Sequence, residues 1–140
     1  MERGFTLVSL VVALALVALV LAATLPRVAR QRDRLACIAA RDALIARAER
    51  TRSEATRLGS AALIVDPDSA RVWWETAGHP RDTLDLRRAF GVDVVQPTGR
   101  TLHLAFDRLG IGRFASATIV LARGTEQASV VVSSYGRMAR

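Results

Sequence analysis

Residues 5–25 contain no charged side chain, and this long apolar run limits what the amino-terminal part can become. A helix rises 1.5 Å per residue, so this stretch would be about 32 Å long and would cross the roughly 30 Å hydrocarbon core of a bilayer. A cleaved secretory signal normally has a shorter apolar run and a clear small-x-small site, which residues 21–24 mimic only weakly. A core helix this apolar would need a larger protein to bury it. We therefore predict a membrane span.

The residues around this span follow a recognisable order. Gly4 precedes Phe5, Thr6 and Leu7, and Pro26 stands 21 residues beyond Phe5. This order resembles the leader and anchor of the prepilin family, which comprises type IV pilins and type II secretion pseudopilins. The resemblance implies a leader at residues 1–4, and a prepilin peptidase that cuts between Gly4 and Phe5 and then methylates the new amino terminus at Phe5.

Ser9 departs from the family pattern, which normally has a glutamate four residues after the first mature residue. In the family that carboxylate is thought to pair with the terminal ammonium of an adjacent subunit, whereas a serine hydroxyl cannot neutralise the charge. Two interpretations stay open. The Ser9 hydroxyl bonds a carbonyl one turn back in its own helix, or the subunit does not need a partner ahead of it, as at a filament tip.

The charge distribution gives a conflicting signal about orientation. The chain has a net charge of +7, and residues 27–57 hold nine Arg against four acids, which gives +5, while residues 58–140 contribute +2. By the positive-inside rule alone, this basic segment would face the cytoplasm. The leader implies the reverse, with residues 1–4 in the cytoplasm and the head in the periplasm. We follow the leader because it is the longer and more specific signal, and we expect a single-pass inner-membrane protein.

After Pro26 the sequence predicts that the helix continues over residues 26–58 as an amphipathic segment. Apolar residues recur at spacings of seven and three, which places them on one stripe: Val28, Leu35, Ile38, Ile45 and Ala48. Gly59 and Ser60 should end the helix. We expect the head to cover part of this stripe and neighbouring copies in a filament to cover the rest. Cys37, between small residues, is interpreted as a small packing residue.

Residues 59–140 predict a β-rich head. Apolar runs and turn residues indicate strands at residues 61–65 and 71–76, a strand pair at 92–95 and 101–106, and a hairpin of 115–122 with 128–134. Asp82 and Gly91 can cap a short helix between them. The adjacent Trp73 and Trp74 should face opposite sides of their strand, one in the core and one half-exposed. The fold class is therefore α+β, a long amino-terminal helix carrying a small antiparallel β-sheet or β-sandwich head.

The carboxyl-terminal part resembles a second family pattern. Its blocks are 106–110, 119–121 and the stretch that ends in Tyr135-Gly136-Arg137. These blocks look like the second half of the GspH/FimT minor pilins. Some members are associated with DNA uptake through a basic tail, so Arg137 and Arg140 are candidate phosphate contacts. The two arginines stand three apart here, whereas a Gly-Arg-x-Arg tail has them two apart.

No pattern in the sequence predicts catalysis, a cofactor or a metal site. One cysteine excludes an intramolecular disulfide, and the two histidines, His79 and His103, lie far apart along the chain. Asp66 and Asp68 flank a proline as turn residues do, and Arg87-Arg88 suits the last turn of a helix. We expect a structural subunit whose partners are other pilins or pseudopilins, the prepilin peptidase and the inner membrane.

Overall fold

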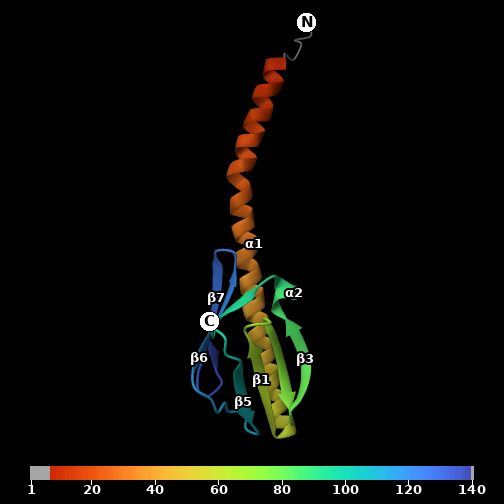
Figure 1. Cartoon of the computed structure of the whole chain (residues 1–140), viewed down its shortest axis with the longest axis vertical. Helices are drawn as coiled ribbons and strands as arrows, with labels where there is room; N and C mark the ends of the chain where they lie inside the picture. Colours follow the sequence, from red (N-terminus) through yellow and green to blue (C-terminus); the bar gives the residue numbers. More distant parts are fainter. Residues whose placement is uncertain (1–6, 140) are drawn as a thin grey trace. The chain divides into compact units, whose positions relative to one another are not determined.

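The computed structural model describes residues 7–139, which divide into two units, one ending at Arg32 and one beginning at Asp33. Helix α1, Leu7–Leu58, contributes to both of them (Figure 1). Pro26 lies inside the helix without ending it. The predicted end is confirmed, because Gly59 has a φ of 92° and its N–H donates to the Ala55 carbonyl at 2.8 Å. A positive φ is readily adopted by glycine, which has no Cβ.

The first unit is a single stretch of exposed helix. Every described residue from 7 to 32 is exposed, including the leucines and valines of the apolar run. The helix contains a window with a mean hydropathy of 2.8 and is long and apolar enough to cross a membrane. Its side chains therefore have no cover from the chain itself and need an apolar environment from elsewhere.

The second unit is built from residues 33–58 of α1 and two antiparallel four-stranded sheets. One sheet has the order β3-β2-β1-β5 and the other the order β4-β6-β7-β8. The strands are β1 Ser60–Asp66, β2 Arg71–Thr76, β3 His79–Asp85, β4 Asp93–Gln96, β5 Leu102–Asp107, β6 Ala117–Arg123, β7 Glu126–Val132 and β8 Met138–Ala139. The short helix α2, Leu86–Phe90, lies between β3 and β4. This confirms the predicted α+β class.

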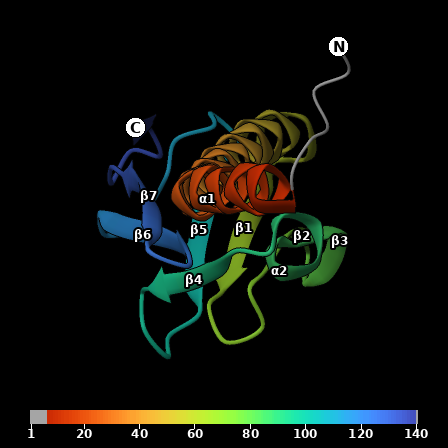
Figure 2. The ribbon, with the colours of Figure 1, turned by 90° about the horizontal axis from the view of Figure 1, so that it is seen from above.

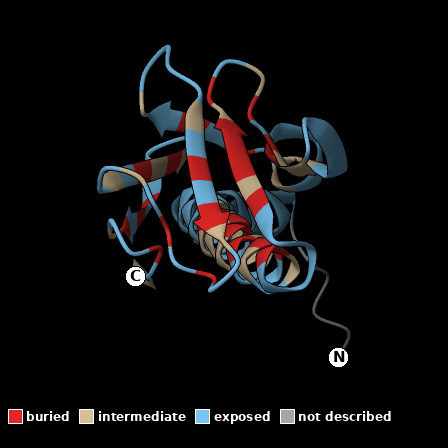
Figure 3. Cartoon of the chain, turned by 90° about the horizontal axis from the view of Figure 1, so that it is seen from below, coloured by how far each residue is buried: buried red, intermediate tan, exposed pale blue. Residues whose placement is uncertain are grey.

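Along β5, β6 and β7, buried residues alternate with less buried ones, as a sheet with one packed face requires (Figure 3). In the hairpin of β6 and β7, Ala117 pairs with Val132 and Ile119 with Val130, so the predicted pairing is confirmed. The strands of the second unit lie beside residues 33–58 of α1 (Figure 2). The core forms where these strands meet α1.

The helix face that enters this core differs from the predicted stripe. The buried residues are mostly small and recur every three or four positions: Cys37, Ala40, Leu44, Ala48, Thr51 and Ala55. Of the predicted stripe only Ala48 is buried, while Val28 and Leu35 are 63% and 61% exposed. Small side chains allow the sheets to approach the helix backbone closely, so side-chain size rather than hydrophobicity marks the packed face. The interpretation of Cys37 as a packing residue is confirmed.

Two predictions for the middle of the head were wrong. Asp82 belongs to β3, and α2 begins later, with the Asp85 carboxylate accepting from the Arg88 N–H at 2.8 Å. Gly91 does close α2. The Asp82 carboxylate pairs with Arg47 and Arg50 of α1. A cap predicted from neighbouring residues cannot reveal partners this distant in sequence.

The expected strand pair around residues 96–99 does not form. β4 pairs with β6 in one sheet, whereas β5 pairs with β1 in the other. Val94 is buried opposite Leu121, so packing across the sheet outweighs nearness in sequence. Trp73 and Trp74 are both half-buried, and only Trp74 packs against the core.

Candidate assembly site

The amino-terminal part of α1, residues 7–25, has the most exposed apolar surface of the described residues. Residues 7–25 present apolar side chains in every direction, and large ones are half or more exposed. They are Leu7, Val8, Leu10, Val11, Val12, Leu14, Leu16, Val17, Leu19, Val20, Leu21 and Leu25. An exposed apolar surface of this extent marks a membrane or protein contact.

The predicted processing and assembly residues fall partly outside the described chain. Gly4, Phe5 and Thr6 lie outside residues 7–139, so the cleavage site and the methylation of Phe5 stay predictions. Ser9 and Pro26 lie in α1 and are exposed, which leaves both accessible to a neighbouring helix. Ser9 also has a polar interaction within the chain.

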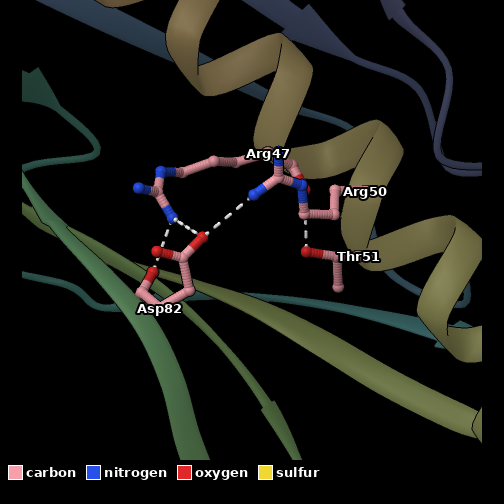
Figure 4. A network of polar contacts seen from close by, with 4 residues as sticks. All are labelled: Arg47, Arg50, Thr51 and Asp82. Atoms are coloured by element: carbon pink, nitrogen blue, oxygen red, sulfur yellow. Dashed lines mark hydrogen bonds and ion pairs between the residues drawn. The ribbon is translucent and has the colours of Figure 1, made fainter.

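An ion-pair network ties the outer strand β3 to α1 (Figure 4). The Arg47 guanidinium lies 2.6 Å from the Asp82 carboxylate and also donates to the Asp82 carbonyl at 2.6 Å. Arg50 approaches the same carboxylate at 3.4 Å. Asp82 has a φ of 45°, an uncommon value for a residue other than glycine that asparagine and aspartate tolerate best. The network thus fixes a strained strand residue against the helix.

A second network fixes the β6–β7 hairpin to α1. Arg123 pairs with Asp33 at 2.8 Å and also donates to the Phe90 carbonyl at the end of α2. One turn along the helix, the Cys37 thiol donates to the Glu126 carbonyl at 3.5 Å. Burial raises the pKa of the Cys37 thiol, so it stays protonated. Sequence reasoning noted Cys37 but missed Arg123, since its two partners are far from it in sequence.

The predicted carboxyl-terminal tail forms β8 and a tight contact with the loop before β6. The Gly112 N–H donates to the Tyr135 carbonyl at 3.1 Å. Gly136 has a φ of 85°, and a Cβ there would lie 2.6 Å from the Phe106 ring. The glycine is therefore required by both backbone conformation and space. Arg137 is exposed beside this contact, and Arg140 lies outside the described residues.

A carboxylate shapes the loop that follows β5. Asp107 accepts the N–H groups of Leu109 and Ile111 at 2.9 and 3.0 Å, and Arg113 lies 3.4 Å away. The Ile111 N–H, and after it the Leu109 N–H and the Arg113 guanidinium, hold the pKa of Asp107 below its ordinary value. In the same way the Arg88 N–H lowers the pKa of the capping residue Asp85. Both carboxylates act as structural acceptors.

Across residues 7–139, no group of three His, Cys, Asp or Glu side chains is arranged to hold a metal ion. His103 is exposed on β5, and His79 lies at the start of β3 in the same sheet but on the opposite edge strand. The recurring interactions are ion pairs and packing contacts that hold the strands of the head on α1.

The chain is similar to known proteins in a motif at its amino terminus and in its fold. Residues 1–25 match the family model described as the prokaryotic N-terminal methylation motif. The fold is similar to the crystal structure of the type IV minor pilin FimU from Pseudomonas aeruginosa PAO1, with a TM-score of 0.59 and 18% identity. That similarity covers 74% of this chain and 86% of FimU. No curated protein sequence shows significant similarity to the chain.

The motif covers residues 1–25, and the likeness to FimU at 18% identity shows that the two chains share a fold. The matched motif belongs to type IV prepilins, and the long helix followed by antiparallel sheets is the pilin fold seen in FimU.

Proposed function

We propose that this chain is a minor subunit of a type IV pilus or of a type II secretion pseudopilus. It is cut between Gly4 and Phe5, methylated at Phe5, and held by one helix in the inner membrane with its head in the periplasm. Other pilins or pseudopilins then replace the lipid around the helix when the subunit enters the filament. The matched motif at residues 1–25 and the pilin fold support this proposal.

The observation that carries the proposal is the contrast in burial along α1. Residues 33–58 bury a face against the chain's own sheets, while residues 7–25 bury nothing. A folded head therefore cannot supply what the anchor needs. Lipid supplies it before assembly, and the anchors of neighbouring subunits supply it afterwards.

The processing step is tested by mass spectrometry of the full chain from membranes. We expect a mature amino terminus at Phe5 that carries one methyl group, and an uncut chain in a strain without prepilin peptidase. A matched variant, Gly4→Val, should remain uncut because the resemblance places the peptidase cut directly after this glycine. An intact Met1 in cells with an active peptidase would contradict the proposal.

We further propose a position at or near the filament tip, on the basis of Ser9. Without a carboxylate four residues after Phe5, the helix lacks the group that neutralises the amino terminus of a neighbour. Ser9→Glu should therefore increase the amount of this subunit in sheared filaments, measured against the major subunit. Ser9→Ala is the control and should leave that amount unchanged. An equal yield for Ser9→Glu and wild type would contradict the tip position.

The two candidate machines are distinguished by deletion of the encoding gene. Loss of surface pili without loss of protein export indicates a type IV pilus, and the reverse indicates a secretion pseudopilus. Complementation with the uncut Gly4→Val chain should fail in either case. If deletion changes neither export nor piliation, the filament proposal fails.

Binding of DNA is the alternative function, and one observation favours it. Arg137 is exposed, and no acidic side chain among residues 7–139 forms an ion pair with it. A phosphate could therefore approach this guanidinium, and such binding would weaken steeply with salt. Gel-shift titration of wild type against Arg137→Gln, with Arg100→Gln as the control, tests it. Absence of retardation in low salt excludes it.

A further inference from the structure

Three arginines follow the membrane-spanning part of α1 directly. Arg27, Arg30 and Arg32 are exposed, and none of them forms an ion pair with the described residues 7–139. Between residues 7 and 32 the sequence contains no acid. The next acid along the helix is Asp33, and its carboxylate is occupied by Arg123 at 2.8 Å. No acidic side chain among residues 7–139 therefore compensates the positive charge of these three arginines.

Helix geometry places these charges at a defined depth. With Leu25 as the last residue of the apolar run, a rise of 1.5 Å per residue puts Arg27, Arg30 and Arg32 about 3, 8 and 11 Å beyond it. The headgroup layer on each side of a bilayer is roughly 5–8 Å thick. Long arginine side chains reach toward it along the helix. All three guanidinium groups can thus meet lipid phosphates.

Successive positions on a helix are turned by 100°, so Arg27 and Arg30 lie about 60° apart on one side of the axis and Arg32 lies about 140–160° away on the other side. This arrangement differs from a single charged stripe, which would favour one neighbouring helix. A charge spread around the helix suits a partner that surrounds it. Arg30 is additionally oriented by a hydrogen bond from its Nε to the Pro26 carbonyl at 3.4 Å.

We propose that Arg27, Arg30 and Arg32 form a collar that binds anionic phospholipid headgroups at the membrane surface on the side of the head. The collar holds the unassembled subunit at a fixed depth, and the contacts break when the subunit leaves the bilayer. The lipid phosphate accepts charge-assisted hydrogen bonds from guanidinium groups, which present donors in a planar fork. The inference rests on the membrane span and not on incorporation into a filament.

The test uses the full chain in nanodiscs that contain spin-labelled phosphatidylglycerol or spin-labelled phosphatidylcholine. The fraction of motionally restricted label reports which lipid lies next to the protein. We expect a preference for phosphatidylglycerol of about fivefold for each arginine at the surface in low salt. At 1 M salt the screening length is about 3 Å, and the preference should nearly vanish.

Two matched triple variants separate the collar from a general effect of charge. Replacing Arg27, Arg30 and Arg32 by Gln should abolish the preference. Replacing Arg81, Arg100 and Arg108 by Gln removes the same charge from exposed positions of the head and should leave the preference unchanged. Equal losses in both variants, or no preference in wild type, would overturn the collar.

The remaining outcomes are also decisive. If wild type shows no lipid preference but the collar variant alone loses copurifying pilins, the arginines bind acids of a protein partner and the inference is wrong. Failure of the chain to enter nanodiscs would refute the membrane span itself. Failure of filament incorporation with a retained lipid preference would refute the proposed function and leave the collar standing.

Discussion

The two parts of helix α1 have the same backbone but opposite relations to their surroundings. In residues 33–58, one face of small residues is buried against two sheets, and Leu44 is 0% exposed. In residues 7–32, every described residue is exposed, and large apolar side chains point in all directions. The chain itself covers the packed face of residues 33–58. The apolar side chains before residue 26 need an apolar environment from outside the chain.

The sharpest test of this contrast compares two leucines of the same helix. Leu44→Ala should lower the free energy of unfolding of the head by about 2–5 kcal/mol, because it leaves a cavity between helix and sheets. Leu35→Ala, at a position that is 61% exposed, should change it by no more than about 0.5 kcal/mol. Urea denaturation of the full chain in detergent, followed by fluorescence of the β2 tryptophans, measures both. Similar losses would mean that Leu35 also packs on the head.

A charge within the anchor should have the complementary effect. Leu16→Arg, in the middle of the span, costs about 2.5–3.5 kcal/mol of membrane insertion and should shift the chain out of the membrane fraction. The stability of the head should not change, since Leu16 is 59% exposed and does not belong to the buried core. Leu16→Ile is the control. Carbonate extraction of membranes gives the result, and full retention of the arginine variant would contradict the span.

The ion pair between the helix and β3 should contribute less. Asp82→Asn preserves a side chain that tolerates the positive φ but removes the charge opposite Arg47, whose side chain is only 18% exposed. Because Asp82 itself is half-exposed, we expect a loss of about 1 kcal/mol. Asp68→Asn, in an exposed turn, should have no comparable effect. Thermal unfolding of the full chain in detergent compares them, and equal melting temperatures for all three proteins would contradict a stabilising clamp.

The smallest expected effect concerns pH. The Ile111 N–H and its neighbours lower the pKa of Asp107 in the folded head, so the unfolded chain takes up a proton first as the pH falls below about 4. The stability contributed by this carboxylate is thus present at neutral pH and is lost as the pH falls through the lowered pKa. Asp107→Asn should be slightly less stable than wild type at pH 7, and the difference should shrink at pH 3. A difference that grows toward pH 3 in thermal unfolding would contradict the assignment.

The regions of the chain differ in how much of their structure could be predicted from the sequence. The long amino-terminal helix, its end at Gly59 and the hairpin of β6 and β7 were predicted correctly because each depends on composition or on neighbouring residues. The wrong predictions share another cause. Asp82 looked like a helix cap, and its partners Arg47 and Arg50 lie more than 30 positions away. The packed stripe was placed on larger residues, although the sheets select the alanine face.

The candidate site was predictable in its linear parts only. Sequence alone indicated the processing motif, Ser9, Pro26 and the glycine-arginine tail, because these are contiguous patterns. It did not indicate that Arg123 joins Asp33 to the end of α2, or that Gly136 is fitted against the Phe106 ring. Such contacts depend on which strand lies beside which, and that is decided by long-range packing.

What the sequence determined by itself is a helix long and apolar enough to cross a membrane, because twenty-one consecutive uncharged residues can satisfy their backbone hydrogen bonds locally. It also determined that a β-rich head follows Gly59. The tertiary structure alone decided the division of that head into two sheets, the helix face they cover and the ion pairs that hold them. The physical reason is range: a helix closes its hydrogen bonds within four residues, whereas a sheet and its core are built from residues distant in sequence.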